Sequence, residues 1–542
     1  MSTAPILIAL QARPDKTTRK HMAADQIRKV LFISADQWRG ECLSALDHPC
    51  VRTPNLDALA AEGVLFRNHY CQASPCGPAR TSMLTGLYMM NHRSLRNGTP
   101  LDARFTNLAL EVRKAGYDPT LFGYTDTSPD PRRYPPDDPV LKTYEGVLPG
   151  MTVGLQLPEH MAAWIADLRA KGYDFPRGRH DVYRPVANYP GADGRGHSFA
   201  PPAFSADDSE TTFMADAILR YLSVRQDQDW FVHGVFLRPH PPIIAPEPYN
   251  AMYDPAAVPL PRRAATPDAE ASQHPYLAYA LTAMAEIGKY NEHYPHSLRE
   301  IDEVEIRQLR ATYYGMISQV DDQVGRLIAH LKQTGEYDHT LIVFTCDHGE
   351  MLGDHWLWGK PGYFDESFHI PLIVRDPRMA ANDGRGRVVA DFTEAVDIMP
   401  TVLDWLGLEP PAQCDGHSLL PFIVGRSPAD WRREVHWEYD FSDVVSLDAE
   451  GALGLDSDQC TLNVIRDHRF KYVHFTALPP LFFDLEKDPG QFNNLSGDPD
   501  HLPLVLSYGQ KLLSWRMQHN ERTLTRSFVT ENGAFHRPRA RR

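Results

Sequence analysis

The chain has 542 residues, of which 42% are hydrophobic and 23% are charged, so it can bury a large core and has the composition of a globular protein. Its net charge of −15 argues against non-specific nucleic-acid binding and means that an anionic substrate needs a locally positive pocket. The seven cysteines are odd in number and include no C-x-x-C pair, which indicates free thiols in a reducing compartment rather than a disulfide framework.

The N-terminal stretch shows neither a membrane span nor an export signal. The apolar run at residues 4–10 is too short to cross a bilayer, and no positively charged leader or clear cleavage site accompanies it. We therefore expect a cytoplasmic protein that binds neither membranes nor nucleic acid. Residues 1–28 otherwise predict a polar leader, or an arm that docks on a partner subunit.

Short apolar runs then alternate with helical patterns. Residues 30–35 predict a strand that is buried on both faces and that leads into Asp36 and Gln37. A helix capped by threonine and ended by Gly63 comes next, and residues 64–66 begin another strand. This alternation is typical of a parallel sheet covered by helices.

The middle of the chain continues the pattern between two loop-rich stretches. Residues 127–206 and 245–300 are rich in proline and turn residues and have weak periodicity, so we expect long loops there, the first of them near the mouth of the site. The other elements are predicted as helices at 107–115, 213–223, 303–333 and 395–406, and as strands at 120–124, 230–237, 341–344 and 370–374.

The sequence pattern changes after residue 425. Two short apolar runs at 460–465 and 470–475 flank a polar turn and predict an antiparallel hairpin, to which residues 481–485 add a strand. A closing helix is predicted at 502–517. We therefore expect three parts, which are an N-terminal arm at 1–28, a main unit at 29–425, and a smaller α+β unit with its tail at 426–542.

The segment CGPAR, from Cys76 to Arg80, carries the clearest chemical signal. Gly77 permits a sharp turn and Pro78 suits the first turn of a helix, so Cys76 is expected at a helix N-terminus, with Gly86 closing the other end. Unpaired N–H groups and the helix dipole favour anionic ligands at such a position. A lone cysteine is more often a small buried hydrophobic residue, so the local pattern leaves that alternative open.

The same segment resembles a known family. C-x-P-x-R is the core that formylglycine-generating enzymes recognise in sulfatases, and the longer pattern CGPAR…LTGLY…NHR resembles the phosphonate monoester hydrolase and arylsulfatase branch of the alkaline phosphatase superfamily. The resemblance extends from about residue 29 to the late 520s. It implies an α/β fold, namely an alkaline phosphatase-like sandwich with a mostly parallel central sheet flanked by helices, and a small C-terminal antiparallel sheet domain. Residues 29–425 would be the catalytic domain.

The resemblance also implies that a formylglycine-generating enzyme oxidises Cys76 to formylglycine during maturation. The hydrated aldehyde would attack sulfur or phosphorus in line, and its second hydroxyl would later expel the sulfate or phosphonate. The chain would then hydrolyse sulfate esters, phosphonate monoesters and phosphodiesters, and the sequence does not rank these small-molecule substrates.

Two predicted strands far apart in the sequence each lead into a pair of potential metal ligands, Asp36-Gln37 and Asp347-His348. Because the site of an open α/β sheet lies at the carboxyl ends of its strands, both pairs are expected to converge beside Cys76. Carboxylates, an amide oxygen and an imidazole suit Mn²⁺, Ca²⁺ or Mg²⁺ better than a thiolate-rich zinc site does. A single aspartate at a strand end is more often a turn residue.

By resemblance, one divalent metal ion is held by Asp36, Asp347, His348 and the modified Cys76, with Gln37 as a fifth ligand. Mn²⁺ or Ca²⁺ is expected before Mg²⁺. Many arylsulfatases have a second aspartate where Gln37 stands and an asparagine where His348 stands, and this departure matches the phosphonate hydrolase branch.

Three further positions match catalytic roles in the family. His240 and Lys360 would donate a proton or positive charge to the leaving oxygen, and Arg80 would steady the formylglycine. His240 follows a predicted buried strand, which favours function over a loop histidine satisfied by backbone groups. Lys360 stands in a Lys-Pro-Gly sequence that is also typical of a solvated turn.

Asn97, Tyr124 and Thr127 match positions that line the phosphonate hydrolase pocket, where they would hydrogen-bond the non-bridging oxygens of the substrate. Each has a structural alternative. Asn97 precedes a glycine and so forms a strong turn signal, and Tyr124 ends a predicted strand and can simply pack there.

Two other functions stay open from the sequence. Unmodified Cys76 is compatible with a two-metal phosphatase or mutase, whose second ion would use Asp354 and His355 together with Glu350, although a supporting role for these residues is the more common case. A non-catalytic anion- or metal-binding protein on the same scaffold is the third alternative. The N-terminal arm and the C-terminal tail suggest, by analogy, a homo-oligomer such as a dimer or tetramer.

Overall fold

The computed structural model describes residues 28–158, 160–283, 297 and 299–537. The predicted arm over residues 1–28 therefore lies outside the described part, apart from its last residue. In the described part, no helix combines the length and the apolar character that a membrane span requires. All seven cysteines are free thiols.

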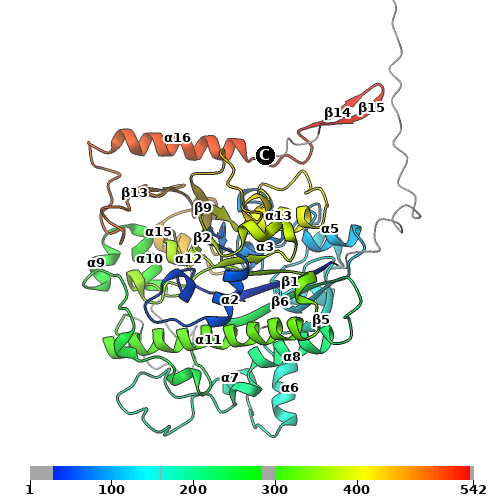
Figure 1. Cartoon of the computed structure of the whole chain (residues 1–542). Helices are drawn as coiled ribbons and strands as arrows, with labels where there is room; N and C mark the ends of the chain where they lie inside the picture. Colours follow the sequence, from blue (N-terminus) through cyan, green and yellow to red (C-terminus); the bar gives the residue numbers. More distant parts are fainter. Residues whose placement is uncertain (1–27, 159, 284–296, 298, 538–542) are drawn as a thin grey trace, which may run out of the picture.

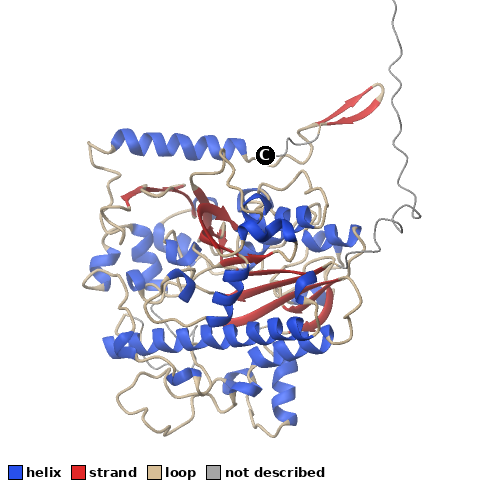
Figure 2. Ribbon diagram, viewed as in Figure 1, coloured by secondary structure: helices blue, strands red, loops and turns tan. Residues whose placement is uncertain are grey.

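An eight-stranded sheet forms the centre of the molecule (Figures 1 and 2). Neighbouring strands are parallel except around β8, which runs antiparallel to both of its neighbours, so the expected mostly parallel sheet is confirmed. In spatial order the strands are β5 (Thr152–Gln156), β4 (Pro119–Gly123), β6 (Trp230–Pro239), β1 (Lys29–Asp36), β7 (Thr340–Cys346), β8 (Leu372–Arg375), β2 (Val64–Tyr70) and β9 (Arg387–Glu394).

Helices cover both faces of this sheet. The long helix α11 (Glu303–Gln333) packs on one face together with α2 (Pro54–Glu62) and α8 (Glu210–Leu222). On the opposite side lie α3 (Cys76–Thr85), α5 (Leu108–Lys114) and α13 (Ile398–Trp405), as Figure 1 shows. The smaller α-helices are α4 (Met89–His92), α6 (Ala162–Ala170), α7 (Arg179–Val182), α9 (Pro267–Ala271), α10 (Pro275–Ala283), α12 (Asp365–Phe368), α14 (Leu420–Ile423) and α15 (Asp448–Leu453).

A second, five-stranded sheet has the order β13 (Leu481–Asp484), β12 (Phe470–Phe475), β11 (Thr461–Arg466), β10 (Val435–Asp440) and β3 (Ala73–Ser74). The predicted hairpin is its β11–β12 pair, and α16 (Leu502–Gln518) packs against these two strands. The edge strand β3 pairs parallel to β10 and ends at Ser74, two residues before Cys76. The C-terminal sheet thus anchors the cysteine loop of the main unit, and the domain boundary after residue 425 stays a prediction.

Some elements were absent from the sequence-based expectation. The stretch 127–206 contains the edge strand β5 and the helix α6, and 245–300 contains α9 and α10, so neither is loop alone. β5 was missed because an edge strand whose side chains are mostly exposed carries no continuous apolar run. Thr53 also makes no capping hydrogen bond at α2, contrary to expectation, since its hydroxyl takes part in a network with Ser44 and Asp57.

The C-terminal tail forms a hairpin of β14 (Ser527–Thr530) and β15 (Gly533–His536) that extends away from the body of the molecule (Figure 1). Its apolar side chains face solvent, with Phe528, Val529 and Phe535 between 58% and 90% exposed. A two-stranded hairpin is marginally stable by itself in water.

Candidate functional site

The topology of the central sheet brings two segments of the site together. β1 and β7 are parallel neighbours in which Ala35 pairs with Cys346, so Asp36 and Asp347 follow at the same carboxyl edge. The N-terminus of α3 meets this edge and carries Cys76, and Gly86 ends the helix with a positive φ of 70°. The convergence expected from the strand ends is therefore present.

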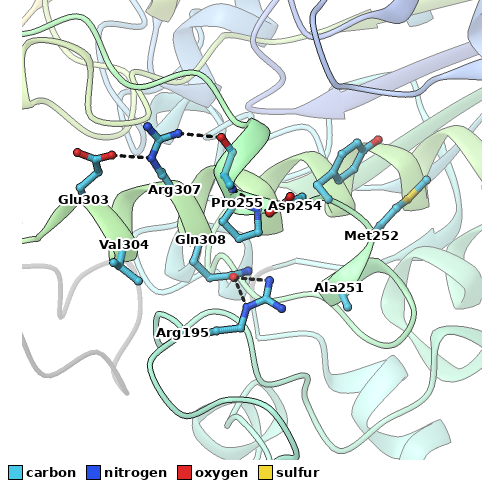
Figure 3. A pocket seen from close by; sticks show the side chains of 11 residues that line it. Arg195, Ala251, Met252, Asp254, Pro255, Glu303, Val304, Arg307 and Gln308 are labelled. Carbon is cyan, nitrogen blue, oxygen red and sulfur yellow. Dashed lines mark hydrogen bonds and ion pairs between the residues drawn. The ribbon is translucent and has the colours of Figure 1, made fainter.

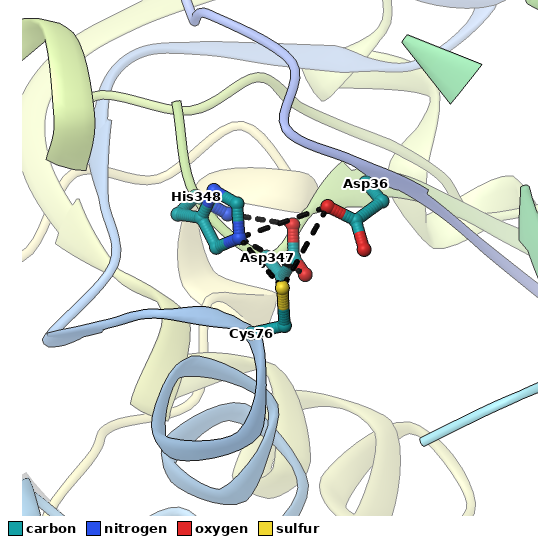
Figure 4. A group of neighbouring side chains, drawn as sticks. All are labelled: Asp36, Cys76, Asp347 and His348. Carbon is teal, nitrogen blue, oxygen red and sulfur yellow. Dashed lines mark hydrogen bonds and ion pairs between the residues drawn. The ribbon is translucent and has the colours of Figure 1, made fainter. Parts of the chain in front are cut away.

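Asp36, Cys76, Asp347 and His348 form one buried cluster whose potential ligand atoms lie within 4.8 Å of one another (Figure 4). The Sγ of Cys76 lies 3.2 Å from Nε2 of His348 and 3.9 Å from Oδ1 of Asp36. Nε2 of His348 lies 3.5 Å from Oδ2 of Asp347. Four residues from three distant parts of the chain thus surround one point.

The protonation of His348 suits a metal ligand. Burial, followed by the charge of nearby Lys360, lowers the pKa of His348 well below its ordinary value, so the ring is neutral. Its Nδ1 lies 3.1 Å from the carbonyl oxygen of Gly349, which assigns the proton to Nδ1 and leaves the lone pair of Nε2 facing the cluster.

The donor set fits a divalent cation. Asp36 and Asp347 supply carboxylate oxygens at positions that are almost fully buried, and His348 supplies an imidazole nitrogen. Such mixed oxygen and nitrogen donors suit Mn²⁺, Ca²⁺ or Mg²⁺, and buried carboxylates need compensating positive charge. The sulfur of Cys76 marks where the oxygens of a modified side chain would lie.

Gln37, the predicted fifth ligand, lies at the same edge. Its backbone has a positive φ of 66°, which is unusual for a residue other than glycine and often marks functional sites. Its N–H donates to Oδ1 of Asp347 at 3.1 Å, and the Tyr313 hydroxyl donates to its carbonyl at 2.6 Å. Its side-chain oxygen accepts a hydrogen bond from Nζ of Lys360 at 2.8 Å.

Arg80 lies beneath the cluster, one helical turn after Cys76. Its Nη2 donates to Asp36 at 2.6 Å and its Nε donates to Asp347 at 3.0 Å, so one guanidinium joins both carboxylates. The same group stacks on the ring of Tyr124, whose hydroxyl donates to Asp36 at 2.5 Å. Arg80 therefore holds the two strand ends in register.

Asp126 is a site residue that the sequence reasoning missed. Its carboxylate lies 3.5 Å from Nη1 of Arg80 in a buried position, and burial raises its pKa to about 7 despite the guanidinium. Its backbone also has a positive φ, of 49°. The available signal was its place between the two predicted pocket residues Tyr124 and Thr127.

The two predicted proton donors approach from different loops. Nζ of Lys360 lies 3.2 Å from Sγ of Cys76 and so reaches the centre of the cluster. His240 follows β6 and is partly exposed, and its Nδ1 lies 2.8 Å from the carbonyl oxygen of Pro241. Its charge contributes to lowering the pKa of His348, which places it near the cluster.

The predicted pocket residues differ in their contacts. Asn97 accepts a hydrogen bond from the N–H of Gly77 at 2.8 Å, so it holds the turn beside Cys76. The Tyr124 hydroxyl is directed to Asp36, as described above. Thr127 is buried, and its hydroxyl lies within hydrogen-bonding distance of Thr125, whose main chain and side chain both accept from it.

The residues of the alternative two-metal site lie outside the cluster. Asp354 accepts a hydrogen bond from Arg39 at 2.5 Å, and Nδ1 of His355 lies 2.8 Å from Glu270. Glu350 is within reach of Gln37 but contributes no atom to the group of four. These contacts favour one metal ion over two.

A separate hollow of about 850 Å³ lies between the N-terminal part of α11 and the loop at 251–256 (Figure 3). Its lining contains none of the predicted site residues. Both of its arginines are engaged, since Arg195 donates to Gln308 at 2.9 Å and Arg307 donates to Glu303 at 2.8 Å.

Comparison with known families and proteins gives consistent matches. A family model described as Sulfatase matches residues 28–408, and one described as the C-terminal part of N-sulphoglucosamine sulphohydrolase matches residues 353–518. The chain is 46% identical to the multifunctional alkaline phosphatase superfamily protein PehA of Trinickia caryophylli, over 92% of this chain and 97% of that protein. It is 25% identical to an arylsulfatase of Clostridium perfringens, over 92% of this chain and 95% of that protein.

The fold matches a solved structure equally well. The crystal structure of the phosphonate monoester hydrolase of Agrobacterium radiobacter superposes with a TM-score of 0.90 at 49% sequence identity. The match covers 94% of this chain and all of that one. The chain therefore has the overall fold of that protein.

Proposed function

The chain belongs to the sulfatase family of the alkaline phosphatase superfamily, and from this premise we propose that it hydrolyses phosphonate monoesters, phosphodiesters and sulfate esters with a formylglycine nucleophile formed from Cys76. The observation that carries the proposal is the buried cluster of Asp36, Cys76, Asp347 and His348 at the start of α3. A sulfur that merely filled the core would not need two carboxylates, an imidazole and Nζ of Lys360 around it.

One divalent cation would be held by Asp36, Asp347 and His348, together with the modified Cys76 and the amide oxygen of Gln37. Such a cation supplies Lewis acidity, which polarises the ester and lowers the pKa of a nearby hydroxyl. Mn²⁺, Ca²⁺ and Mg²⁺ all accept oxygen-rich donor sets. Of these, we propose Mn²⁺ or Ca²⁺ as the first candidates and Mg²⁺ as the third.

The protein's own groups account for the bond changes. In the hydrated aldehyde at position 76, one hydroxyl gives its proton to solvent water, and its oxygen forms a bond to sulfur or phosphorus while the ester bond to the leaving oxygen breaks. His240 gives the leaving oxygen its proton, and Lys360, which lies 3.2 Å from Sγ of Cys76, offsets negative charge at the reacting group. Arg80 keeps the carboxylates of the site in place.

The second hydroxyl completes the cycle. When this hydroxyl gives its proton to solvent water, the electron pair left on its oxygen forms the aldehyde C=O bond, and the bond from that carbon to the ester oxygen breaks. Sulfate or phosphonate leaves, and water then hydrates the aldehyde again. Because cleavage takes place at carbon, the same step serves sulfur and phosphorus esters, which supports a broad substrate range.

The relatives support the same range. PehA is described as multifunctional, the Agrobacterium radiobacter protein as a phosphonate monoester hydrolase, and the Clostridium perfringens protein as an arylsulfatase. Asn97, Tyr124 and Thr127 remain proposed substrate contacts. Of these, Asn97 is the best placed, since it is exposed and already contacts the turn at Cys76.

We also propose a homo-oligomer, such as a dimer or tetramer, and maturation by a formylglycine-generating enzyme in the cytoplasm. The support for the oligomer is the exposed apolar surface of the C-terminal unit, where Phe528, Val529 and Phe535 on the hairpin and Leu506 and Leu513 on α16 face solvent. A second copy of the chain offers the same surface in return, as a two-fold interface requires.

A comparative kinetic panel tests the proposed activity. The kcat/KM values for p-nitrophenyl sulfate and for phenyl phosphonate esters are measured on one sample whose metal content and conversion of Cys76 are known. We expect turnover of both ester classes. If metal-loaded, formylglycine-bearing protein turned over neither p-nitrophenyl sulfate nor the phenyl phosphonate esters, the result would support the non-catalytic alternative.

A further inference from the structure

Glu350 lies at the base of the loop that connects His348 with Lys360, and its side chain is almost fully buried, at 1% exposure. Its Oε2 accepts a hydrogen bond from Nε2 of Gln37. Its Oε1 accepts from the backbone N–H of Leu352 at 2.9 Å and from that of Gly359 at 2.6 Å. One carboxylate therefore receives three donors from two separate segments of the site.

These contacts fix the orientation of the Gln37 amide. Burial raises the pKa of Glu350, but its ionised carboxylate only accepts hydrogen bonds and the ammonium of Lys360 only donates them, so both contacts direct the NH₂ group of the amide to Glu350. The oxygen of the amide must then face the other way, where it accepts from Nζ of Lys360 at 2.8 Å. A rotation of the amide by half a turn would place two acceptors against each other at Glu350 and two donors against each other at Lys360.

The same carboxylate also fixes the start of the Lys360 segment. The N–H of Gly359, one residue earlier, is held by Glu350, and the N–H of Met351 donates to the carbonyl of Gly359 at 2.7 Å. The hydroxyl of Ser74 donates to the carbonyl of Lys360 at 2.7 Å. The backbone on both sides of the lysine is thus held from within the site.

We propose that Glu350 is a positioning residue that directs the amide oxygen of Gln37 toward the metal position and aligns Lys360 with the reacting group. The inference rests on the proposed function, because it takes Gln37 as a metal ligand. It gives Glu350 a role distinct from a second metal site. It also explains why a glutamine can be a metal ligand where related enzymes use an aspartate. An amide has one oxygen and one NH₂ group, and Glu350 holds it with the oxygen toward the metal position.

The test exchanges the carboxylate and the amide between positions 350 and 37, first at one position and then at both. In Glu350→Gln the new side chain keeps its size but has one acceptor and one NH₂ group. If its oxygen keeps the two backbone N–H groups, its NH₂ faces the NH₂ of Gln37, and the amide of Gln37 rotates. Adding Gln37→Glu restores a donor facing an acceptor, and the second oxygen of the new carboxylate again faces Lys360.

The measurement is the Kd for Mn²⁺, obtained by competition with a fluorescent chelator, on variants with the same measured conversion of Cys76. We expect Glu350→Gln to weaken Mn²⁺ binding roughly 10- to 100-fold, as loss of an outer hydrogen-bond partner does at other metal sites. In the Gln37→Glu background, the same exchange is expected to leave Mn²⁺ binding unchanged or to strengthen it.

Glu270→Gln is the matched control. Glu270 lies on α9, is equally buried and pairs with His355 of the loop that carries Glu350. Within the described part of the chain, the other hydrogen bonds of its carboxylate come from Ala264 and Gln273, not from Gln37 or Lys360. We expect this variant to keep the Mn²⁺ affinity of the parent even if its melting temperature falls.

The kinetic readout is a fall in kcat for Glu350→Gln that the added Gln37→Glu substitution partly reverses.

The outcomes separate this inference from the proposed function. A parent protein that binds Mn²⁺, with Glu350→Gln within twofold of it, would overturn the inference and leave the proposed function standing. If Glu350→Gln does not fold, the comparison of Gln37→Glu with the double variant decides instead, and a tenfold weaker double variant overturns the inference. A parent that binds no divalent metal would refute the proposed function itself.

Discussion

Nε2 of His348 lies 3.2 Å from Sγ of Cys76, although 272 positions separate the two residues in the sequence. The contact exists because β7 delivers the histidine to the carboxyl edge of the sheet and α3 begins at that edge with the cysteine. Burial and the neighbouring Asp36 raise the pKa of the Cys76 thiol well above its ordinary value. In the metal-free protein the unmodified side chain is therefore a neutral thiol and a poor nucleophile.

The number of metal ions distinguishes the single-ion site from a two-metal site. Elemental analysis should give one divalent ion per chain in the parent and in His355→Ala, because His355 pairs with Glu270 outside the cluster. His348→Ala should retain much less than one ion per chain, since it removes the nitrogen donor. Two ions in the parent, with one lost in His355→Ala, would instead establish the two-metal alternative.

Removal of His240 should affect poor leaving groups most. If this histidine protonates the leaving oxygen, His240→Ala should lower kcat about 10²- to 10⁴-fold for phenyl esters and less for p-nitrophenyl esters, whose leaving groups need less protonation. The control is His501→Ala, in which the lost histidine pairs with Asp498 in the C-terminal unit. An equal loss for both leaving groups would argue that His240 binds substrate without transferring a proton.

Asp126 should make the stability of the metal-free protein depend on pH. Burial raises its pKa from 3.8 to about 7, so between these values the folded state holds a proton that the unfolded state has lost. Its contribution to the free energy of unfolding is therefore full below pH 4 and decreases as the pH rises to 7, by at most about 1.4 kcal/mol per pH unit. Asp126→Asn removes this dependence.

Urea denaturation of the parent and of Asp126→Asn at several pH values, with chelator present, measures the effect. The free energy of unfolding of the parent should fall relative to that of the variant between pH 4 and 7, and the difference should be constant above pH 8. A difference that is the same at pH 5 and pH 8 would show that Asp126 has an ordinary pKa.

The exposed hairpin should hold subunits together. The chain mass is 61.3 kDa, and light scattering coupled to size exclusion should give a multiple of this mass for the full chain. Replacing Phe528, Val529 and Phe535 by serine should reduce the number of chains per particle, for example from four to two or from two to one. The reason is that these side chains are largely exposed in the single chain and would be buried in the interface. A parent that is monomeric at micromolar concentration would contradict the proposed oligomer.

The main elements were predictable because local patterns determine them. The bounds of α11 agree with the amphipathic pattern at 303–333, and β1 and β7 agree with short runs of buried apolar residues. The pairs that follow these strands, Asp36-Gln37 and Asp347-His348, could be placed together because parallel strands end at one edge. The convergence on Cys76 needed, in addition, the family resemblance of its segment.

The remaining features depend on long-range contacts that no local pattern specifies. β3 has two residues and forms a strand only because β10, more than 300 positions later, provides its partner. Asp126 and Glu350 are single acidic residues in loops, and their roles follow from Arg80 and Gln37, which reach them from other elements. Exposed edge strands such as β5 lack the apolar run that reveals a buried strand.

The most direct test of the account is the mass of the peptide that contains Cys76, measured on active enzyme. Conversion of the cysteine to formylglycine lowers this mass by about 18 Da. We predict that the converted fraction is substantial, that turnover per chain rises in proportion to it, and that Cys76→Ser has neither the mass change nor the turnover. Full turnover by a sample in which every Cys76 side chain is still a thiol would contradict the account.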